Sequence, residues 1–262
     1  MSIISLALLV LSHILADFTF QNKDLAEGKQ KYFLKLLKHI LIYFILSVIL
    51  TIFYFNIKLI IILLSITVIH GLIDYFKILF EQAFNRRYSL EFFLFDQLLH
   101  ITVLIAVYPF VSEFKLNIIF QIIYDFLINF YPILGRLTAV HIHSFIIIVI
   151  ILIFNFKASN IIVNKVLIKY RADFKNKEAS KGTAIGNLER LLVLIFVLMG
   201  TYSLVGLLFT AKSLIRFKEL ENCKDKNTNF VEYYLIGTFT SILIAIISGL
   251  IIKFLLNGVN II

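Results

Sequence analysis

The stretch LIIILLSITVIHGLIDYFK, residues 59–77, begins with an apolar run that holds no charge and ends with His70, Asp74 and Lys77. Such a run is typical of a helix that crosses a membrane, because about 20 residues span the hydrocarbon core. Ionisable side chains are costly in lipid, so they tend to be partnered and to carry function. This stretch therefore predicts a membrane-spanning helix with a polar site in it.

The rest of the chain has the same character. Of its 262 residues, 60% are hydrophobic and 16% are charged, whereas soluble domains average about 45–50% apolar and about 25% charged residues. Apolar runs between charged breaks predict spans near residues 2–20, 36–55, 58–79, 91–111, 138–156, 188–210 and 231–255. We therefore expect an all-α, polytopic transmembrane helical bundle of about six or seven spans. It would form one integral-membrane domain with halves 1–112 and 113–262.

Two further segments are expected to be amphipathic helices at the membrane surface. Residues 117–134 are apolar except for Gln121, Asp125 and Asn129, which lie four residues apart on one helical stripe. Residues 158–171 are also apolar with interspersed basic residues. A helix with one polar face lies in the interface between lipid and water.

The charges of the loops predict an orientation. Residues 21–38 carry five lysines against two acidic residues, and residues 157–187 carry seven basic against two acidic residues. Residues 112–137 are balanced, with two of each. Because positively charged loops stay in the cytoplasm, the first two segments are predicted to be cytoplasmic, with the N-terminus outside. The basic 157–187 loop is also a candidate docking surface for a cytoplasmic partner or anionic lipid.

One segment does not fit this orientation. Residues 211–230 have five basic residues against three acidic ones on the predicted outer side. Either the charge rule is weak there, or residues 188–209 form a re-entrant hairpin bent around Gly200 and Gly206. The sequence leaves both alternatives open.

Other classes of protein are disfavoured. The single cysteine, Cys223, permits no internal disulfide and no cysteine-based metal site. The net charge of +9 resides in loops beside apolar segments and not in a polar basic domain, so we expect no nucleic-acid binding. Residues 1–20 lack a basic start and a small-residue cleavage site, and are expected to remain in the mature protein.

Three predicted spans carry a histidine and an aspartate at a four-residue spacing, which puts both on one helical face. The pairs are His13 and Asp17, His70 and Asp74, and Asp96 and His100. In the last pair the aspartate precedes the histidine, and its span crosses the membrane in the opposite direction to the other two. The aspartates of the three spans therefore lie at one depth and the histidines at another. We expect the three aspartates in a layer near the cytoplasmic face and the three histidines about 6 Å deeper. His39, at the start of the second span, is expected close to the aspartates.

Three imidazoles near carboxylates suit a divalent transition metal, zinc above all, because nitrogen and oxygen are its usual ligands when no cysteine is present. The expected metal ligands are His13, His70 and His100. The expected catalytic groups, as a further ligand or as the base that activates a metal-bound water, are Asp74, Asp96 and Asp17. The expected substrate contacts are Lys77, Gln21, Gln97 and His39. Glu189 and Arg190 are expected either to form an ion pair or to lie as a lid above the aspartates.

The string His13-Ile-Leu-Ala-Asp17-Phe-Thr-Phe-Gln21, His39, the His70, Asp74 and Lys77 set, and Asp96-Gln97-x-x-His100 resemble one family. This is the bacterial membrane family catalogued as domain of unknown function 3307, and the resemblance covers the first half of the chain. It implies a bacterial inner-membrane protein and implies no activity.

The leading functional hypothesis is a metal-dependent hydrolase of a lipid or lipid-linked substrate at the cytoplasmic leaflet. The alternative is a transporter or proton-coupled or ion-coupled channel in which the same groups titrate. A non-catalytic membrane subunit, in which the pairs only hold the bundle together, is the third hypothesis.

Overall fold

The computed structural model describes residues 2–84, 88–112, 114–170, 179–215, 217 and 228–258. Within these ranges the chain forms helices and no strand. Five helices are long and apolar enough to cross a membrane: Phe33–Tyr54, Ile57–Ala83, Ser89–Val111, Ala139–Val166 and Val231–Gly258. The expected all-α membrane protein is therefore confirmed.

The chain divides into two compact units, residues 1–153 and 154–262. The α-helices of the first unit are α1 (Ser2–Leu15), α2 (Lys23–Gly28), α3 (Phe33–Thr51), α4 (Ile57–Ala83), α5 (Ser89–Val111), α6 (Ile118–Phe130) and α7 (Ala139–Ile153). Its shorter turns are η1 (Ala16–Phe20), η2 (Ile52–Tyr54) and η3 (Pro132–Arg136). The second unit comprises η4 (Phe154–Ala158), α8 (Ser159–Val166), η5 (Leu167–Tyr170), α9 (Ala179–Leu198), α10 (Tyr202–Ile215) and α12 (Thr228–Gly258).

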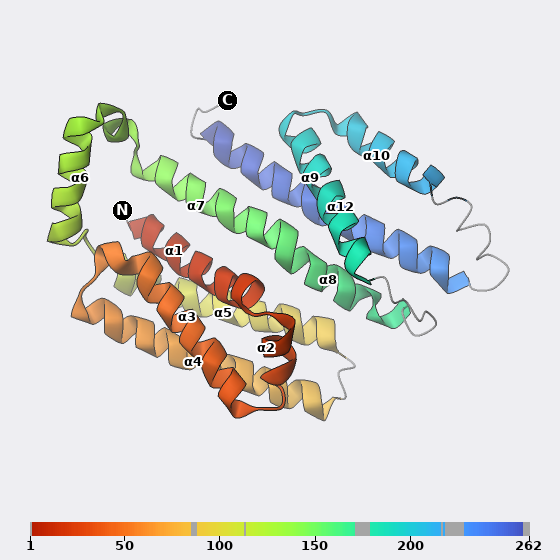
Figure 1. Ribbon diagram of the computed structural model, residues 1–262, viewed down its shortest axis with the longest axis horizontal. Coiled ribbons are helices and arrows are strands. Elements are labelled where there is room, and N and C mark those ends of the chain that lie inside the picture. Colours follow the sequence, from red (N-terminus) through yellow and green to blue (C-terminus); the bar gives the residue numbers. More distant parts are fainter. Residues whose placement is uncertain are drawn as a thin grey trace. The chain divides into compact units, whose positions relative to one another are not determined.

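In the first unit, α1 is the central helix. It packs against α3, α5 and α7, while α4 packs against both α3 and α5. Helices α1, α3, α4 and α5 therefore lie side by side (Figure 1). Their shared core includes Leu9, Tyr43, Leu63 and Leu104, each almost fully buried. A helix that buries one stripe and leaves apolar side chains on its other faces is suited to lipid as the surrounding solvent.

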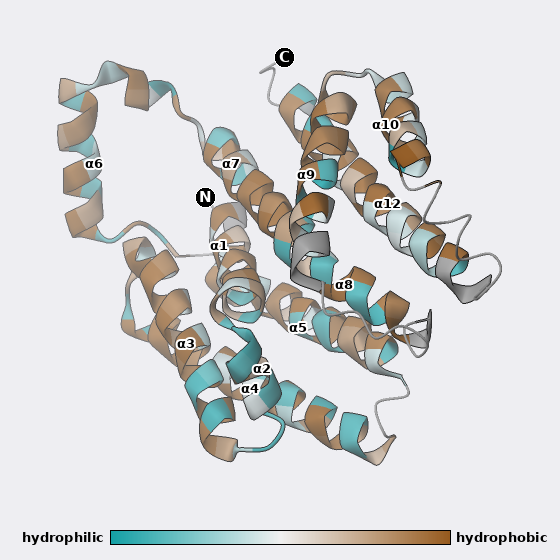
Figure 2. Ribbon diagram, turned by 45° about the vertical axis from the view of Figure 1, so that its right-hand side comes forward, coloured by the Kyte–Doolittle hydropathy of each residue, from teal (hydrophilic) through white to brown (hydrophobic). Residues whose placement is uncertain are grey.

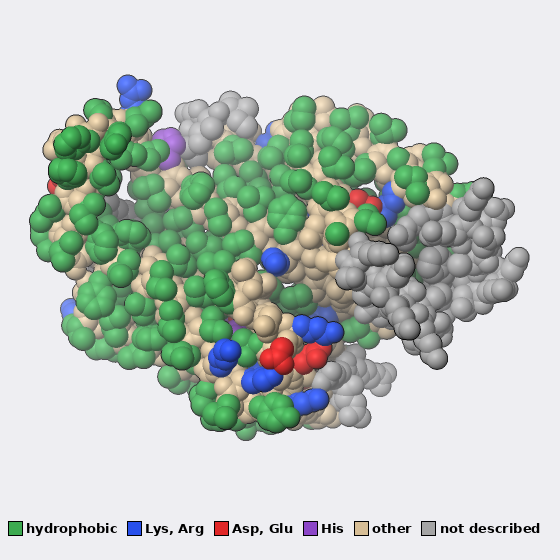
Figure 3. All heavy atoms as spheres, viewed as in Figure 1, with side chains coloured by type: hydrophobic (Ala, Val, Ile, Leu, Met, Phe, Trp, Pro, Cys, Tyr) green, Lys and Arg blue, Asp and Glu red, His purple; other side chains and the backbone are tan. Residues whose placement is uncertain are grey.

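Apolar side chains cover most of the visible surface (Figure 3). Exposed residues on α3 and α4 such as Leu41, Ile45 and Leu64 would be unfavourable in water but not in a bilayer. Polar residues are concentrated on α2 and the adjoining ends of α3 and α4 (Figure 2), and charged side chains gather over α2 (Figure 3). This end of the unit is therefore the one suited to contact with water.

Asparagine side chains define where helices begin. The side chain of Asn22 accepts a hydrogen bond from the backbone N–H of Leu25 at 2.8 Å at the start of α2. Asn56 does the same for Leu59 at 2.9 Å at the start of α4. An N-cap of this kind satisfies a backbone donor that the first turn leaves free, so the loops before α2 and α4 end at definite residues.

Small residues bring the helices of the first unit close together. A Cβ atom added to Gly71 of α4 would lie only 2.5 Å from Cδ1 of Ile40 in α3. The hydroxyls of Ser12 in α1 and Ser47 in α3 are 3.1 Å apart and hydrogen-bonded. Close approach at small residues is a common basis of helix packing in membranes.

The second unit departs from the expectation of one continuous span over residues 188–210. Helix α9 ends at Leu198, α10 begins at Tyr202, and Gly200 between them has a φ of +74°. A glycine adopts this left-handed conformation without the clash that a Cβ would cause. The bend expected at Gly200 is thus present, whereas Gly206 lies inside α10.

The two segments expected to be amphipathic are helical in the structure. Helix α6 covers residues 118–130 and has no buried residue. Helix α8 is the last part of the candidate span Ala139–Val166. It is therefore not the separate helix expected over residues 158–171. Residue 171 itself, and with it part of the basic 157–187 loop, lies outside the described residues.

Candidate functional site

Five helical segments of the first unit bring one polar cluster together. Its members are His13 of α1, Asp17 of η1, His39 of α3, His70 and Asp74 of α4, and Asp96, Gln97 and His100 of α5. The seven histidines and aspartates of this set are each no more than 7% exposed. These eight residues together are called the His/Asp cluster.

The centre of the His/Asp cluster is the Nε2 atom of His39. It lies 3.3 Å from Asp17 Oδ1, 3.3 Å from Asp74 Oδ2 and 3.2 Å from His70 Nε2. His70 Nε2 is also 3.7 Å from Asp17 Oδ1. His39 therefore lies close to the aspartates, as its position at the start of the second span predicts, and it contacts them directly.

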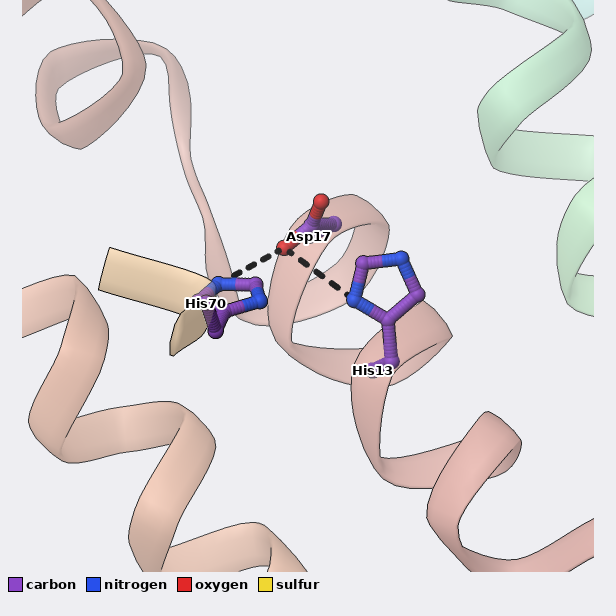
Figure 4. A group of neighbouring side chains, drawn as sticks. All are labelled: His13, Asp17 and His70. Carbon is purple, nitrogen blue, oxygen red and sulfur yellow. Dashed lines mark ion pairs between the residues drawn. The ribbon is translucent and has the colours of Figure 1, made fainter. Parts of the chain in front are cut away.

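Asp17 lies between imidazoles of two helices (Figure 4). Besides its contact with His70, its Oδ1 is 4.0 Å from Nδ1 of His13, one turn earlier in the chain. Asp17 belongs to the π-helical turn Ala16–Phe20, which widens the end of α1. Single π-turns inside helices are frequent at functional sites, and this one sets the position of the Asp17 carboxylate.

The three histidines predicted to be level do lie together. The ring centroids are 4.7 Å apart for His13 and His100, 4.3 Å for His70 and His100, and 5.5 Å for His13 and His70. The ring of Tyr43 stacks on His70 at 4.3 Å. A narrow cavity beside these rings is lined by the apolar side chains of Ile66 and Leu104, among others.

One ring nitrogen of His13 and one of His100 face acceptors that are not carboxylates. His13 Nε2 faces Gln97 Oε1 at 3.3 Å, and His100 Nδ1 faces the backbone oxygen of Asp96 at 2.8 Å. Their second nitrogens, His13 Nδ1 and His100 Nε2, are buried without a hydrogen-bond partner in the described part of the chain. Both rings thus retain one nitrogen that is free to bind a ligand inside the bundle.

Gln97 connects two carboxylates. Its Nε2 donates to Asp17 Oδ2 at 3.0 Å and to Asp96 Oδ2 at 3.1 Å. Because its amide oxygen faces His13, the orientation of the amide is determined on both sides. Gln97 was expected to contact a substrate, and the structure places it among the acidic groups.

Two lysines bind the aspartates of the His/Asp cluster. Lys77 of α4 donates to Asp96 Oδ2 at 2.7 Å, and Lys29 donates to Asp74 Oδ2 at 2.7 Å. The sequence pattern did not single out Lys29, because it is one of five lysines in residues 21–38 and lies between α2 and α3, where no helical periodicity marks it. Its burial, at 8% exposed, distinguishes it from Lys23, whose side chain is 88% exposed.

The formal charges in this buried region do not balance. Asp17, Asp74 and Asp96 carry three negative charges, whereas Lys29 and Lys77 carry two positive charges. With neutral imidazoles one negative charge remains, and an uncompensated buried charge is costly. A bound cation or a protonated histidine would complete the balance.

The donor atoms of the cluster fall into three groups. In each group one ligand atom per residue lies within 4.8 Å of the others. The groups are His13, Asp17 and His70; His39, His70 and Asp74; and Asp74, Asp96 and His100. The second group contains two imidazoles and one carboxylate, and it includes His39, which was expected to contact substrate rather than metal.

The remaining expected site residues lie elsewhere. Gln21 follows η1, and its Oε1 is buried without a hydrogen-bond partner among the described residues. Glu189 and Arg190 belong to the second unit. Glu189 of α9 forms an interhelical ion pair with Lys212 of α10 at 2.5 Å, as one of the two expectations has it, and Arg190 binds neutral acceptors. Their expected role as a lid above the aspartates stays a prediction.

Comparisons with known proteins identify part of the chain. Residues 5–129 match the family described as protein of unknown function (DUF3307). The match confirms the resemblance expected from the histidine and aspartate motifs, and it spans every residue of the His/Asp cluster. No curated protein and no solved structure matches the chain.

Proposed function

We propose that the His/Asp cluster binds a divalent metal ion, zinc above all, and that the protein is a metal-dependent hydrolase of a lipid or lipid-linked substrate. The observation that carries the proposal is the spacing of donor atoms around His39 Nε2, which lies 3.2 Å from His70 Nε2 and 3.3 Å from Asp74 Oδ2. Zinc binds nitrogen and oxygen at about 2.0–2.1 Å in a tetrahedron, so its ligands are roughly 3.3–3.4 Å apart.

The proposed ligands are His39, His70 and Asp74. Two imidazoles and one carboxylate form a usual protein set for a catalytic zinc, whose fourth position holds water. This set differs from the one expected from the sequence. His13 and His100 do not belong to the donor group that contains His39, so we assign them to the wall of the site.

Asp17 is the proposed general base. Its Oδ1 lies 3.3 Å from His39 Nε2 and 3.7 Å from His70 Nε2. A carboxylate there can accept the proton of a metal-bound water. Gln97 holds the other oxygen of Asp17 and connects it to Asp96, which Lys77 neutralises.

Lys29 has a supporting role in this proposal. Its hydrogen bond to Asp74 Oδ2 orients a carboxylate that would also bind the metal. Partners of this kind hold metal ligands in place and tune them. A lipid or lipid-linked substrate is proposed because the site is enclosed by helices suited to lipid, and we place it at the cytoplasmic face of a bacterial inner membrane on the charges of residues 21–38.

The test uses Asp17→Asn in detergent-purified protein loaded with zinc, with Asp125→Asn on the exposed helix α6 as the matched control. Turnover is measured on a panel of acyl-ester, amide and phosphodiester lipids. Wild type and control should hydrolyse one lipid class, and a chelator should stop them. Asp17→Asn should retain zinc and lose about a hundredfold or more of the rate, since a general base contributes that much.

Two results would contradict the hydrolase. If zinc-loaded wild type hydrolyses none of the lipids, or if Asp17→Asn retains full activity, the catalytic role is wrong. If Asp17→Asn instead loses its zinc, Asp17 is a fourth ligand, and a site with four protein ligands is of the closed, structural kind.

A proton pathway is the second candidate, and one observation favours it. Contacts run without a break from Lys29 through Asp74, His39 and Asp17, and then through Gln97 to Asp96 and Lys77. Chains of titratable groups inside membranes are typical of proton relays. Proton flux into liposomes that metal-free wild type supports and Asp96→Asn abolishes would favour this function over hydrolysis.

A further inference from the structure

Arg190, in the middle of α9, is a buried cation of the second unit. It is 2% exposed. Its Nε donates to the backbone oxygen of Asn155 at 2.9 Å, and its Nη1 donates to Ser241 Oγ at 2.8 Å. Its Nη2 donates to Oδ1 of both Asn160 and Asn187 at 2.5 Å. Every one of these acceptors is neutral.

No carboxylate among the described residues forms an ion pair with this charge. The neighbouring Glu189 is engaged by Lys212 at 2.5 Å, so that pair is neutral by itself. Buried charges are normally paired, because removing them from water without a counter-charge is costly, and an ionisable group between apolar helices is usually functional. The guanidinium of Arg190 therefore lacks a bound anion among these residues.

Not every polar group around Arg190 has a partner. A guanidinium has five N–H groups, and the contacts above use four, which leaves one on Nη1. The side chain of Asn155 is fully buried, and neither its Nδ2 nor its Oδ1 has a hydrogen-bond partner in the part of the chain that the structure describes. Buried polar groups of this kind are rare without a ligand or water.

Gly186 lies next to Nη1, the atom that carries the unused N–H group. A Cβ atom added to Gly186, one turn before Arg190 on α9, would meet only Nη1 of Arg190 within 4 Å, at 3.5 Å, among described atoms outside the helix backbone. A side chain at this position would narrow the approach to the guanidinium. Gly186 is itself half-buried, so the approach is from the surface of α9.

We propose that Arg190 and the amide of Asn155 form a phosphate-binding site that is reached over Gly186. A guanidinium suits phosphate because it keeps its positive charge, and its remaining N–H group can donate to a phosphate oxygen. The ligand is the phosphate group of an anionic lipid headgroup or free inorganic phosphate. This site is separate from the His/Asp cluster and does not depend on the proposed hydrolase.

The test measures the thermal stability of the detergent-purified full chain with phosphatidylglycerol, phosphatidylcholine or inorganic phosphate added. Wild type should be stabilised by several degrees by phosphatidylglycerol, by inorganic phosphate or by both, because a ligand that binds only the folded state raises its stability. Phosphatidylcholine, which bears no net charge, should have little effect. A response to the lipid alone identifies a headgroup site, and a response to inorganic phosphate alone identifies a free-phosphate site.

The decisive variant is Asn187→Asp. Oδ1 of Asn187 accepts from Arg190 and from Asn160 Nδ2, so a carboxylate there meets two donors. This substitution should raise the thermal unfolding midpoint of the ligand-free protein and abolish the stabilisation by phosphate. Asn257→Asp, at an exposed position near the end of α12, is the matched control and should do neither.

Gly186→Leu tests the approach to the site while leaving Arg190 unchanged. It should remove the response to phosphate without loss of folding, since leucine has a higher helix propensity than glycine. If neither phosphate source stabilises wild type, or if Asn187→Asp responds as wild type does, the proposal is wrong.

Discussion

Lys29 reaches the His/Asp cluster from a loop and not from a span. Its Nζ lies 2.7 Å from Asp74 Oδ2, and both side chains are nearly inaccessible, at 8% and 1% exposed. The exposed pair of Lys23 and Glu27, by contrast, is 3.8 Å apart. A buried pair matters because the loss of one partner leaves an isolated charge.

Lys29→Met should therefore destabilise the protein by about 3–5 kcal/mol, since the Asp74 carboxylate would remain buried without its cation. Thermal unfolding in detergent, followed by circular dichroism, measures this loss. Lys23→Met is the matched control and should change stability by less than about 1 kcal/mol, because exposed pairs contribute little. Equal effects of the two substitutions would show that the Lys29 contact is unimportant for folding.

Individual site residues were predictable where helical geometry governs them. The four-residue spacings placed each histidine and aspartate on one face, and the position of His39 near the start of its span placed it beside Asp17 and Asp74. Lys29 lies in a loop, where no period relates sequence to position. The direction in which a ring nitrogen points, as for His13 and His100, depends on neighbouring side chains and not on spacing.

At the scale of helices, the contact between α3 and α4 holds two proposed metal ligands together. Gly71 lies next to His70, and a Cβ there would come within 2.5 Å of Ile40, the residue after His39. Gly71→Leu should therefore push the helices apart and weaken metal binding at least tenfold, because ligation requires fixed geometry. The measurement is the zinc dissociation constant of the purified variant.

The same contact offers a compensating change. Ile40→Ala removes the side chain that a residue at position 71 would meet, so the double variant Gly71→Leu with Ile40→Ala should regain much of the affinity. If Gly71→Leu alone binds zinc as tightly as wild type, the separation of α3 and α4 does not control the site.

The turn between α9 and α10 depends on the conformation of Gly200. Gly200→Ala should lower stability by about 1–2 kcal/mol, because a Cβ is unfavourable at positive φ. Gly206→Ala provides the matched control: Gly206 is inside α10, and an added Cβ there would meet no described atom within 4 Å outside the helix backbone, so the change should be neutral or stabilising. The thermal unfolding midpoints of both variants, measured in one detergent, test this prediction. A stabilising effect of Gly200→Ala would contradict the assigned turn.

Helices were predictable where length and hydropathy determine them. The spans expected near residues 36–55, 58–79 and 91–111 correspond to α3, α4 and α5 with ends displaced by a few residues. Residues 188–210 are equally apolar, so composition could not distinguish one span from two shorter helices. The excess of basic residues in 211–230 left open whether the charge rule is weak there or the chain bends, and the positive φ of Gly200 shows that the backbone turns at this residue.

For the whole molecule, the charges of the loops predict which segments face the cytoplasm. In a Cys223→Ser background, a cysteine replacing Lys31 should react with a membrane-impermeant thiol reagent only from the cytoplasmic side. A cysteine replacing Ile133, which is 70% exposed in η3, should react only from the opposite side. These results follow from the retention of basic loops in the cytoplasm, and labelling of both from the same side would contradict the orientation.

The central claim is that the His/Asp cluster binds a metal through His39, His70 and Asp74. The most direct measurement is the zinc content of detergent-purified protein from zinc-supplemented cells, by elemental mass spectrometry. Wild type and the control His143→Ala should hold about one equivalent, while His39→Ala and His70→Ala should lose most of it, because each removes a ligand. Less than roughly a tenth of an equivalent of zinc or any other transition metal in wild type, or full zinc retention in His39→Ala, would contradict the account.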